Sequence, residues 1–442
     1  DDTRSRLLAE VDEMSDAALR TLAVAYRPLA ASEDAQAGEA LEQGLIFVGT
    51  VGIIDPPREE AKQAIGDALR AGIRVIMITG DHPRTAARIA ADLGITQPGA
   101  KAISGVEIDA MDDAAFAGAV RKTSVFARVA PAHKLRIVDA LQADGQVVAM
   151  TGDGVNDAPA LKSADIGVAM GGTGTEVTKE AAKMILADDN FATIVAAVRE
   201  GRGIFDNIEK FLRYLLSSNM GEVLTIFLGV VGAGVIGLQD GSGTLVLPLL
   251  ATQILWINLL TDSWPAMTMG VDPHTDDVMA RPPRRTDERV IDARMWVGVV
   301  QIGLVMAVAT LLTIDLFLPG GLIQGTYEIE TARTAGFTVL VFAQLFNCFN
   351  ARSALTSAFH RPFVNPWLWA AVTLSALLQV AVVHVELLNR AFGTVPLSAE
   401  QWLTCMAMAS TVLWFGELRK VFLRFGRPSV TASFSAHERH RS

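Results

Sequence analysis

Cysteine and charged residues are both scarce in this chain of 442 residues. The two cysteines, Cys348 and Cys405, lie inside apolar stretches, so we expect packing roles rather than a disulfide or a metal site. Charged residues make up only 19% of the sequence, which is low for a soluble protein of this size. The net charge is -10 and no dense basic stripe is present, so nucleic acid is excluded as an expected partner.

Hydrophobic residues make up half of the chain and are unevenly distributed. Up to about Gly203 charged and apolar residues alternate as in a globular domain, whereas beyond Phe211 the apolar stretches reach membrane-spanning length. Residue 1 is Asp rather than Met, so we expect the chain to be cut from something longer.

Strand-like and helix-like segments alternate from Leu45 onward, which predicts an α/β unit with a parallel, doubly wound sheet. Before it, a single helical pattern covers 15–22. The expected strands are 45–54, 74–79, 124–128, 146–150 and 166–170, and the expected helices are 59–71, 85–93, 132–142 and 158–163.

Six membrane spans forming an all-α bundle are predicted at about 212–238, 246–270, 294–318, 335–353, 366–388 and 400–418. The loop after the second span, the loop near Arg361 and the tail after Glu417 are basic, while the other loops carry almost no Lys or Arg. The positive-inside rule therefore places the first 200 residues and the C-terminus in the cytoplasm. We expect a multi-pass protein in contact with membrane lipid, in a bacterial plasma membrane.

The strongest local motif is the run at 150–161, Met-Thr-Gly-Asp-Gly-Val-Asn-Asp-Ala-Pro-Ala-Leu. Asp153 and Asp157 are two carboxylates on a glycine-containing loop after a strand, where oxygen ligands suit Mg²⁺. Asn156 offers an amide to position one of them. A solvated Asp-Gly turn is the alternative for a lone pair of residues, but the full run favours the metal site.

Two further segments converge on this loop. Thr79, Gly80 and Asp81 end another strand, where a hydroxyl and backbone N–H groups suit a phosphoryl oxygen. Lys134 opens a helix after the segment 126–131, and its ammonium could neutralise charge on a transferring phosphoryl group.

Together these segments resemble the haloacid-dehalogenase-type phosphorylation domain of the P-type ATPases, which are ATP-driven cation pumps. The runs at 55–58, 77–81, 126–128 and 152–161 occur in the family's order and spacing, and the resemblance extends from near Arg20 to the last span. It implies ATP and Mg²⁺ as cofactors, with 55–58 as the hinge to the nucleotide domain. The roles it implies are Mg²⁺ ligation by Asp153 and Asp157, catalysis by Thr79, Gly80, Asp81, Lys134 and Asn156, and nucleotide binding by Arg20 and Arg128.

The family's nucleophile, an Asp followed by Lys-Thr-Gly, does not occur in this sequence. Asp55 follows a strand but precedes two prolines, which excludes it from that role. The chain alone is therefore expected to be inactive, and we expect the missing N-terminal part of the same pump to be its partner.

Polar residues inside the first two spans predict a cation path, because buried charges are costly in a membrane. Asn219 and Glu222 are three residues apart and share a helix face. Asn258, Thr261 and Asp262 project to one side of the second span, where Pro265 can free backbone carbonyls. Polar contacts between helices are the alternative. The all-oxygen ligands suit a hard inorganic cation such as Ca²⁺, with Mn²⁺, Na⁺ or Mg²⁺ as other candidates.

Within the family the two spans look most like the calcium pumps of the endoplasmic-reticulum type. Where those pumps carry a Glu in the fourth span, this sequence has Gln344, which leaves the number of ions per cycle open.

The resulting prediction is the C-terminal part of a P-type pump, exporting Ca²⁺ through an aspartyl phosphate formed upstream of this chain. A membrane-anchored phosphatase of the same superfamily and a truncated, non-catalytic pump partner are the alternatives. The predicted parts are a nucleotide-domain remnant at 1–45, a phosphorylation domain without its nucleophile segment at 46–205, the membrane domain at 206–420 and a cytosolic tail at 421–442.

Overall fold

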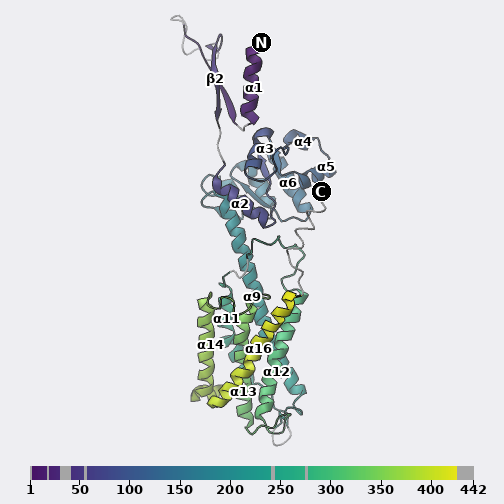
Figure 1. The fold of residues 1–442 in the computed structure, drawn as a ribbon, viewed down its shortest axis with the longest axis vertical. Coiled ribbons are helices and arrows are strands. Elements are labelled where there is room, and N and C mark those ends of the chain that lie inside the picture. The colour runs from purple at the N-terminus through teal and green to yellow at the C-terminus, as the bar shows by residue number, and fades with distance from the viewer. Residues whose placement is uncertain are drawn as a thin grey trace. The chain divides into compact units, whose positions relative to one another are not determined.

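The computed structural model describes residues 2–16, 19–29, 41–53, 57–239, 244–273 and 277–425. The chain divides into two compact units (Figure 1). The first unit is built from strands and helices and comprises Asp1–Glu200 with Val278–Asp287. The second is helical and comprises Gly201–Asp277 with Glu288–Ser442.

The N-terminal elements are the helix α1 (Asp2–Asp16) and two antiparallel strands, β1 (Arg20–Tyr26) and β2 (Ile46–Ile53). The strand predicted at 45–54 is confirmed as β2. The helix predicted at 15–22 is wrong over most of its length, because α1 already ends at Asp16 and the strand β1 begins at Arg20. Leu22, Val24 and Tyr26 alternate with smaller residues, a period-two pattern, and pairing with β2 satisfies the backbone groups of β1.

The first parallel sheet has the strand order β3-β5-β4. Its strands and helices are β3 (Met77–Thr79), α3 (Pro83–Asp92), β4 (Ile103–Ser104), α4 (Gly105–Asp109), α5 (Asp113–Lys122), β5 (Val125–Ala127) and α6 (Pro131–Ala143). Because successive side chains point to opposite faces of a sheet, Val125 and Ala127 pack against α3 while Phe126 packs against α4, α5 and α6. Helices thus cover both faces, as in a doubly wound arrangement.

A second parallel sheet has the order β6-β7-β8. The elements of this region are β6 (Ala149–Gly152), η2 (Val155–Asp157), α7 (Ala158–Ser163), β7 (Ile166–Met170), α8 (Glu176–Ala181) and β8 (Met184–Leu186). The helix α2 (Glu59–Arg70), which precedes β3 in the chain, packs in a separate apolar cluster with Val195. One continuous parallel sheet was the expectation, and the described strands instead form two parallel sheets and the separate antiparallel pair β1-β2. β3 and β6 share no ladder, although Ile78 and Met150 pack in one apolar cluster with Val138 of α6.

The second unit is formed by helices that run alongside one another (Figure 1). They are α9 (Phe191–Val231, which begins in the first unit), α10 (Ala251–Trp256), the π-helical η3 (Ile257–Thr261), α11 (Ser263–Met269), α12 (Ala293–Phe317), α13 (Ile329–Ala351), α14 (Pro366–His384), α15 (Glu386–Phe392) and α16 (Ala399–Phe425). Of the described helices, four are long and apolar enough to cross a membrane, namely α9, α12, α13 and α14. The predicted second and sixth spans, at α10–α11 and α16, are not among these four.

The predicted second span is broken in the middle, and Pro265 explains part of the break. A proline has no N–H, so it cannot donate to the carbonyl four residues earlier. That carbonyl belongs to Thr261, and the Ser375 hydroxyl of α14 donates to it at 3.0 Å. One residue further, the N–H of Asp262 donates to the carbonyl of Ile257 at 2.9 Å, five residues back, which is the π-helical pattern. The sequence therefore predicted the loosened helix correctly.

Helix α13 packs against both α12 and α16 and is the most buried of the four long apolar helices. Glycines allow the close approach on both sides. A Cβ at Gly336 would lie 2.6 Å from the Ile314 side chain of α12, and one at Gly416 of α16 would lie 2.2 Å from the Asn350 amide. This packing holds the polar residues of α13 at fixed positions inside the bundle.

A surface carboxylate of the first unit gives its stability a dependence on pH. The Val148 N–H and the Gln142 amide donate to Asp165, at 2.8 and 3.2 Å, and these bonds lower the pKa of the Asp165 carboxyl. The lowered value means that the stabilisation is present above the unfolded pKa of about 3.9 and is lost as the pH falls through the folded value.

We therefore expect the difference in Tm between the wild-type protein and Asp165→Asn to be largest near neutral pH. It should shrink as the pH falls below about 4, where the wild-type carboxyl also becomes neutral. Thermal unfolding of the full-length protein from pH 3 to 7, roughly the range over which carboxylates titrate, measures this difference. A difference that is the same at every pH would contradict the role of the charge.

Candidate functional sites

The carboxylate of Asp157 is the centre of the polar site in the first unit. Asp157 ends η2 directly after β6 and is 6% exposed. The ammonium of Lys134, in the first turn of α6, lies 2.5 Å from its Oδ1, and the Gly154 N–H donates to its Oδ2 at 3.3 Å. The structure therefore brings together two residues that sequence analysis placed in one site, from segments 23 positions apart.

The absence of a side chain at Gly152 allows the Asp157 carboxylate to lie against the backbone of the turn that follows β6. A Cβ at Gly152 would lie 2.5 Å from the Cβ of Asp157 and 2.7 Å from its Oδ2. Any larger residue would push the carboxylate away from Lys134. The glycine of the motif thus has a steric role in the geometry of Asp157.

Asp153 is held through its backbone and presents an exposed side chain. Its carbonyl accepts the Thr175 N–H at 3.1 Å and the hydroxyl of the buried Thr178 at 3.2 Å. Just before Thr175, the N–H groups of Gly172 and Thr173 donate to Asp189, and these bonds lower the pKa of that carboxyl. The 171–178 segment was missed by sequence analysis, and its available signal was the helix-capping threonine at the start of α8.

The other predicted catalytic residues cluster less tightly around Asp157. The Thr79 hydroxyl donates to Asp81 Oδ2 at 2.9 Å and accepts the Asp81 N–H at 3.1 Å, so these two form a local turn at the end of β3. Gly80 and Asn156 are exposed in their turns. No hydrogen bond recorded among the described residues joins Thr79, Asp81 or Asn156 to Asp157.

The two arginines predicted to bind nucleotide lie in different elements. Arg128 is exposed, has a left-handed backbone with φ of 49°, and donates its N–H to the Asp81 carbonyl at 3.2 Å. Arg20 begins β1 opposite Ile53. The predicted hinge at 55–58 is described only for Pro57 and Arg58, since Asp55 and Pro56 lie outside the described residues.

The donor set of the Asp157 site fits Mg²⁺ chemically. Asp157 and the exposed Asp153, four residues apart on one loop, carry carboxylate oxygens, which are the hard ligands that Mg²⁺ prefers. Lys134 supplies a fixed positive charge beside them. The set suits a hard cation next to a phosphoryl group.

A second polar site lies inside the helical unit around Glu222. This residue of α9 is 4% exposed. The Asn258 amide donates to its Oε2 at 2.7 Å, and the Gln344 amide of α13 donates to its Oε1 at 3.0 Å. Three of the residues predicted to bind the transported cation, Glu222, Asn258 and Gln344, are therefore in contact.

Asp262 lies at the break of the second span and is 2% exposed. Its Oδ1 accepts the hydroxyl of Tyr214 at 2.9 Å, whereas its Oδ2 and the Oε1 of Gln344 have no hydrogen-bond partner within 3.5 Å in the described structure. Buried oxygens without a donor are uncommon in folded proteins. They are the kind of group that a bound cation would satisfy.

Two of the predicted cation ligands do not join this site through their side chains. The Thr261 hydroxyl donates to the Ile257 carbonyl of its own helix at 3.2 Å. Asn219 is exposed, although it lies three residues before the buried Glu222. Over the described ranges no group of three or more His, Cys, Asp or Glu side chains is placed to hold a metal ion.

Tyr214 was missed by sequence analysis as a part of this site. It is fully buried and lies two helical turns before Glu222 on α9, so both face the same side. The spacing of eight residues between Tyr214 and Glu222 was the signal in the sequence that could have placed the Tyr214 phenol in this site. On α13, the Asn347 amide donates to the Ser217 hydroxyl of α9 at 2.7 Å, which adds a second polar link between these helices.

Family models match both units. Residues 246–422 match the model described as "Cation transporting ATPase, C-terminus", and residues 7–165 and 134–198 match haloacid dehalogenase-like hydrolase models. The matched segments contain the Asp157 site and most of the helices that surround Glu222. The two halves of the chain thus resemble two parts of one kind of protein.

Curated relatives match nearly the whole chain. It is 44% identical over 413 residues to the "Calcium-transporting ATPase" of Bacillus subtilis (strain 168), covering 93% of this chain and 44% of that protein. It is 38% identical to "Calcium-transporting ATPase 4, endoplasmic reticulum-type" of Arabidopsis thaliana, covering 95% of this chain and 45% of the relative. "Calcium-transporting ATPase 1" of Yarrowia lipolytica is 39% identical, with 96% and 44% covered.

The chain spans less than half the length of these relatives. Its order of a haloacid-dehalogenase-like α/β unit followed by apolar helices agrees with the family matches and with the structure. The chain therefore belongs to the P-type cation-transporting ATPases and corresponds to the C-terminal portion of its calcium-transporting relatives.

Proposed function

We propose that the intact protein is an ATP-driven pump that exports Ca²⁺ from the cytoplasm. The observation that carries this proposal is the pair of buried carboxylates, Glu222 and Asp262, inside apolar helices. Among the described residues both accept hydrogen bonds from neutral groups only, so their ionised forms have no positive charge to balance them until a cation binds. Carboxylate and amide oxygens suit Ca²⁺, and the named function of the relatives supports that choice.

The Asp157 site is proposed to take part in phosphorylation of an Asp that lies upstream of this chain. Asp153 and Asp157 would hold Mg²⁺, which when bound neutralises charge on the transferring phosphoryl group. Lys134 holds a positive charge beside that group, and the Thr79 hydroxyl and Gly80 N–H orient its oxygens, with Asp81 fixing the hydroxyl. Asn156 positions the loop, and Arg20 and Arg128 act on the nucleotide side.

The two separate parallel sheets support this assignment. Each of β3 and β6 has a strand partner on one side only within the described sheets, and their residues Ile78 and Met150 share one apolar cluster. We propose that the upstream segment with the phosphorylated Asp adds a strand between them. That strand would end beside Thr79 and Gly152, at the carboxyl ends of its neighbours, where parallel sheets bind ligands.

The remaining assignments follow the sequence prediction. We propose six spans, with the broken helix α10–α11 and α16 added to the four long helices, and with the first 200 residues and the C-terminus in the cytoplasm of a bacterium. The parts are a nucleotide-domain remnant at 1–45, the phosphorylation domain at 46–205, the membrane domain at 206–420 and a tail at 421–442. The helix α9 joins the phosphorylation domain to Glu222 without a break.

Phosphorylation of the full-length protein in membranes tests this proposal. We expect incubation with γ-labelled ATP and Mg²⁺ to give an acid-stable, hydroxylamine-sensitive label that requires Ca²⁺. A label that ignores Ca²⁺ and answers another cation would change the transported ion. Hydrolysis of small phosphate esters without any cation dependence would instead indicate a membrane-anchored phosphatase, and no label under any condition would leave a non-catalytic pump partner.

The contact of Thr178 with the Asp153 backbone gives a prediction about Mg²⁺. Thr178→Val keeps the shape of the side chain and removes the hydroxyl that donates to the Asp153 carbonyl. We expect the Mg²⁺ concentration for half-maximal labelling to rise about tenfold, as for other residues that support a metal ligand. Thr193→Val is the matched control, because its hydroxyl donates to the exposed Asp188. Equal Mg²⁺ dependence of the two variants would contradict the role of Thr178.

A further inference from the structure

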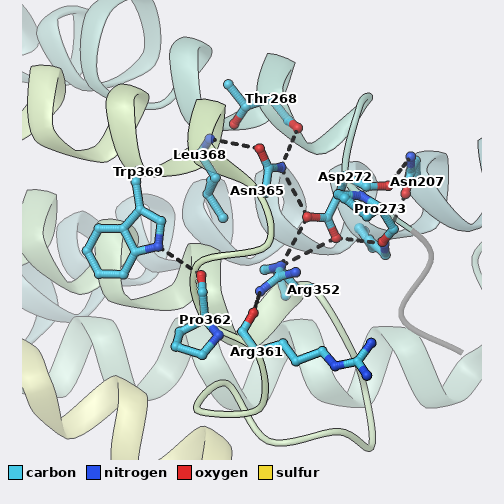
Figure 2. Close-up of polar contacts among 12 residues, drawn as sticks. Asn207, Thr268, Asp272, Pro273, Arg352, Arg361, Pro362, Asn365, Leu368 and Trp369 are labelled. Carbon is cyan, nitrogen blue, oxygen red and sulfur yellow. Dashed lines mark hydrogen bonds and ion pairs between the residues drawn. The ribbon is translucent and has the colours of Figure 1, made fainter.

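Asp272 is a buried carboxylate that follows α11, and both of its oxygens are occupied. Its Oδ1 accepts the Asn365 amide at 3.0 Å and the Arg352 Nε at 3.1 Å, while its Oδ2 accepts the Lys210 ammonium at 2.8 Å. The side chain is 0% exposed. Figure 2 shows the carboxylate between Arg352 and Asn365. Lys210, Asp272, Arg352 and Asn365 are called the Asp272 cluster below.

Each partner of Asp272 comes from a different helix. Lys210 lies on α9, Arg352 directly follows α13, and Asn365 directly precedes α14. Asn207, one turn before Lys210, also donates to the backbone carbonyl of Asp272 at 2.9 Å. A single residue thus joins α9, the broken second span, α13 and α14 at one end of the bundle.

The segments joined by Asp272 include those that carry the proposed cation ligands. Glu222 is on α9, Asp262 is on the broken span and Gln344 is on α13. At about 1.5 Å per residue, Lys210 is roughly 18 Å along α9 from Glu222, and Arg352 is roughly 12 Å from Gln344. A continuous helix transmits a rotation or shift over such a distance.

The charges of the Asp272 cluster favour a single arrangement of its side chains. Lys210 and Arg352 are two buried cations that share one carboxylate, and their side chains are 7% and 9% exposed. A buried ion that loses its partner is strongly unfavourable, so both must stay in contact with Asp272. The Lys210 ammonium has two further acceptors, the Asn207 side-chain carbonyl at 3.0 Å and the Pro273 carbonyl at 3.4 Å, so each of its three protons has an acceptor.

We propose that Asp272 is a positioning residue for the cation site. Asp272 holds α9, the broken span and α13 in the register in which Glu222, Asp262 and Gln344 face one cation. This inference rests on the proposed function, because it concerns the same cation site. Among the described residues, Asp272 makes no hydrogen bond or ion pair with Glu222, Asp262 or Gln344. It acts through the helices to which its partners belong.

Lys210→Met and Arg352→Met in the full-length protein test the proposal. Each change removes the charged contact between Asp272 and one ligand-bearing helix and leaves a neutral ion pair behind, unlike Asp272→Asn, which leaves two cations unpaired. We expect the Ca²⁺ concentration for half-maximal labelling from ATP to rise about tenfold or more in each variant. Arg352→Lys keeps a positively charged partner for Asp272. Its half-maximal Ca²⁺ concentration should therefore return most of the way to the wild-type value.

Labelling from inorganic phosphate without Ca²⁺ reports on the phosphorylation site alone. Per amount of folded protein, labelling from inorganic phosphate should stay within about twofold of wild type in both Met variants. A twofold change corresponds to less than about 0.5 kcal/mol. A purely structural role would instead lower both kinds of labelling together.

Two control variants separate cation positioning from a general loss of stability. Asn389→Ala removes the amide that donates to the Val382 and Val383 carbonyls at the other end of α14, at 2.9 Å each. Arg390→Met removes a cation from an exposed ion pair with Glu386. We expect Asn389→Ala to lower Tm and neither control to shift the Ca²⁺ dependence.

Two results would overturn the positioning role. The first is a half-maximal Ca²⁺ concentration within about twofold of wild type in Lys210→Met and Arg352→Met. The second is a shift in Asn389→Ala as large as in these variants. A failure of the proposed function is distinguishable, because wild type itself would then show no Ca²⁺-dependent label.

Discussion

Replacing Asp157 with Asn in the full-length protein is expected to slow formation of the phosphoenzyme by about 100-fold or more. The carboxylate is buried, accepts the Lys134 ammonium at 2.5 Å and is a proposed Mg²⁺ ligand. An amide carries no charge, so it binds the metal weakly and no longer balances Lys134. The measurement is the initial rate of labelling from γ-labelled ATP at saturating Ca²⁺ and a series of Mg²⁺ concentrations.

The same substitution should also reduce stability, and this effect has to be separated from the catalytic one. Breaking a fully buried ion pair costs about 3–5 kcal/mol, and the Lys134 side chain is 19% exposed, so a cost of about 1–3 kcal/mol is expected. Asp113→Asn is the matched control, because the Asp113 side chain is 100% exposed and pairs with Arg136. Its stability and labelling rate should stay close to wild type.

Should Asp157→Asn keep a wild-type labelling rate after correction for folded protein, the Asp157 site would not be the site of phosphorylation. A rate that recovers fully at high Mg²⁺ would confine the role of the carboxylate to metal affinity. Both outcomes are visible in the same titration. Gly152→Ala offers an independent check, since its Cβ would displace Asp157 without changing any charge.

The parts of the fold that were predictable from sequence are those with local signals. β7 and α7 have the predicted bounds, because a short apolar strand and a helix with Pro159 in its first turn are encoded by neighbouring residues. The Lys134–Asp157 pair was also placed in one site, since the carboxyl ends of parallel strands meet at one edge of a sheet. The broken span followed from Pro265.

The features that escaped prediction depend on contacts between distant segments. The first residues of β1, at 20–22, were taken for the end of a helix, because pairing with the distant strand β2 is needed to satisfy their backbone. Asp272 looked like a loop residue, and only the packing of four segments buries it against Lys210 and Arg352. Tyr214 reaches Asp262 across 48 positions of the chain. No local pattern encodes such pairings in a single sequence.

Glu222→Gln in the full-length protein is expected to raise the Ca²⁺ concentration for half-maximal labelling by about 100-fold or more, because Ca²⁺ affinity depends on the number of ligand charges. Both oxygens of Glu222 now accept amide protons, from Asn258 and Gln344. A glutamine there has one oxygen, so its NH₂ group would face another NH₂ group. The substitution therefore removes a charge and disturbs the two contacts that orient the site.

Glu386→Gln is the matched control for this prediction. It is the same substitution in the same unit, at a residue whose side chain is 80% exposed and pairs with Arg390. Its Ca²⁺ dependence should equal that of wild type, because an exposed pair contributes little. If Glu222→Gln also equals wild type, the transported cation is bound elsewhere in the intact protein.

Gln344→Glu examines the same site from the opposite direction. It adds a carboxylate where an amide now donates to Glu222 at 3.0 Å, so two like charges would face each other when no cation is present. A bound Ca²⁺ relieves that repulsion, and we expect the half-maximal Ca²⁺ concentration to fall by about tenfold. Opposite shifts in Glu222→Gln and Gln344→Glu would mean that both residues face one cation, since a general loss of packing would move the two variants in the same direction.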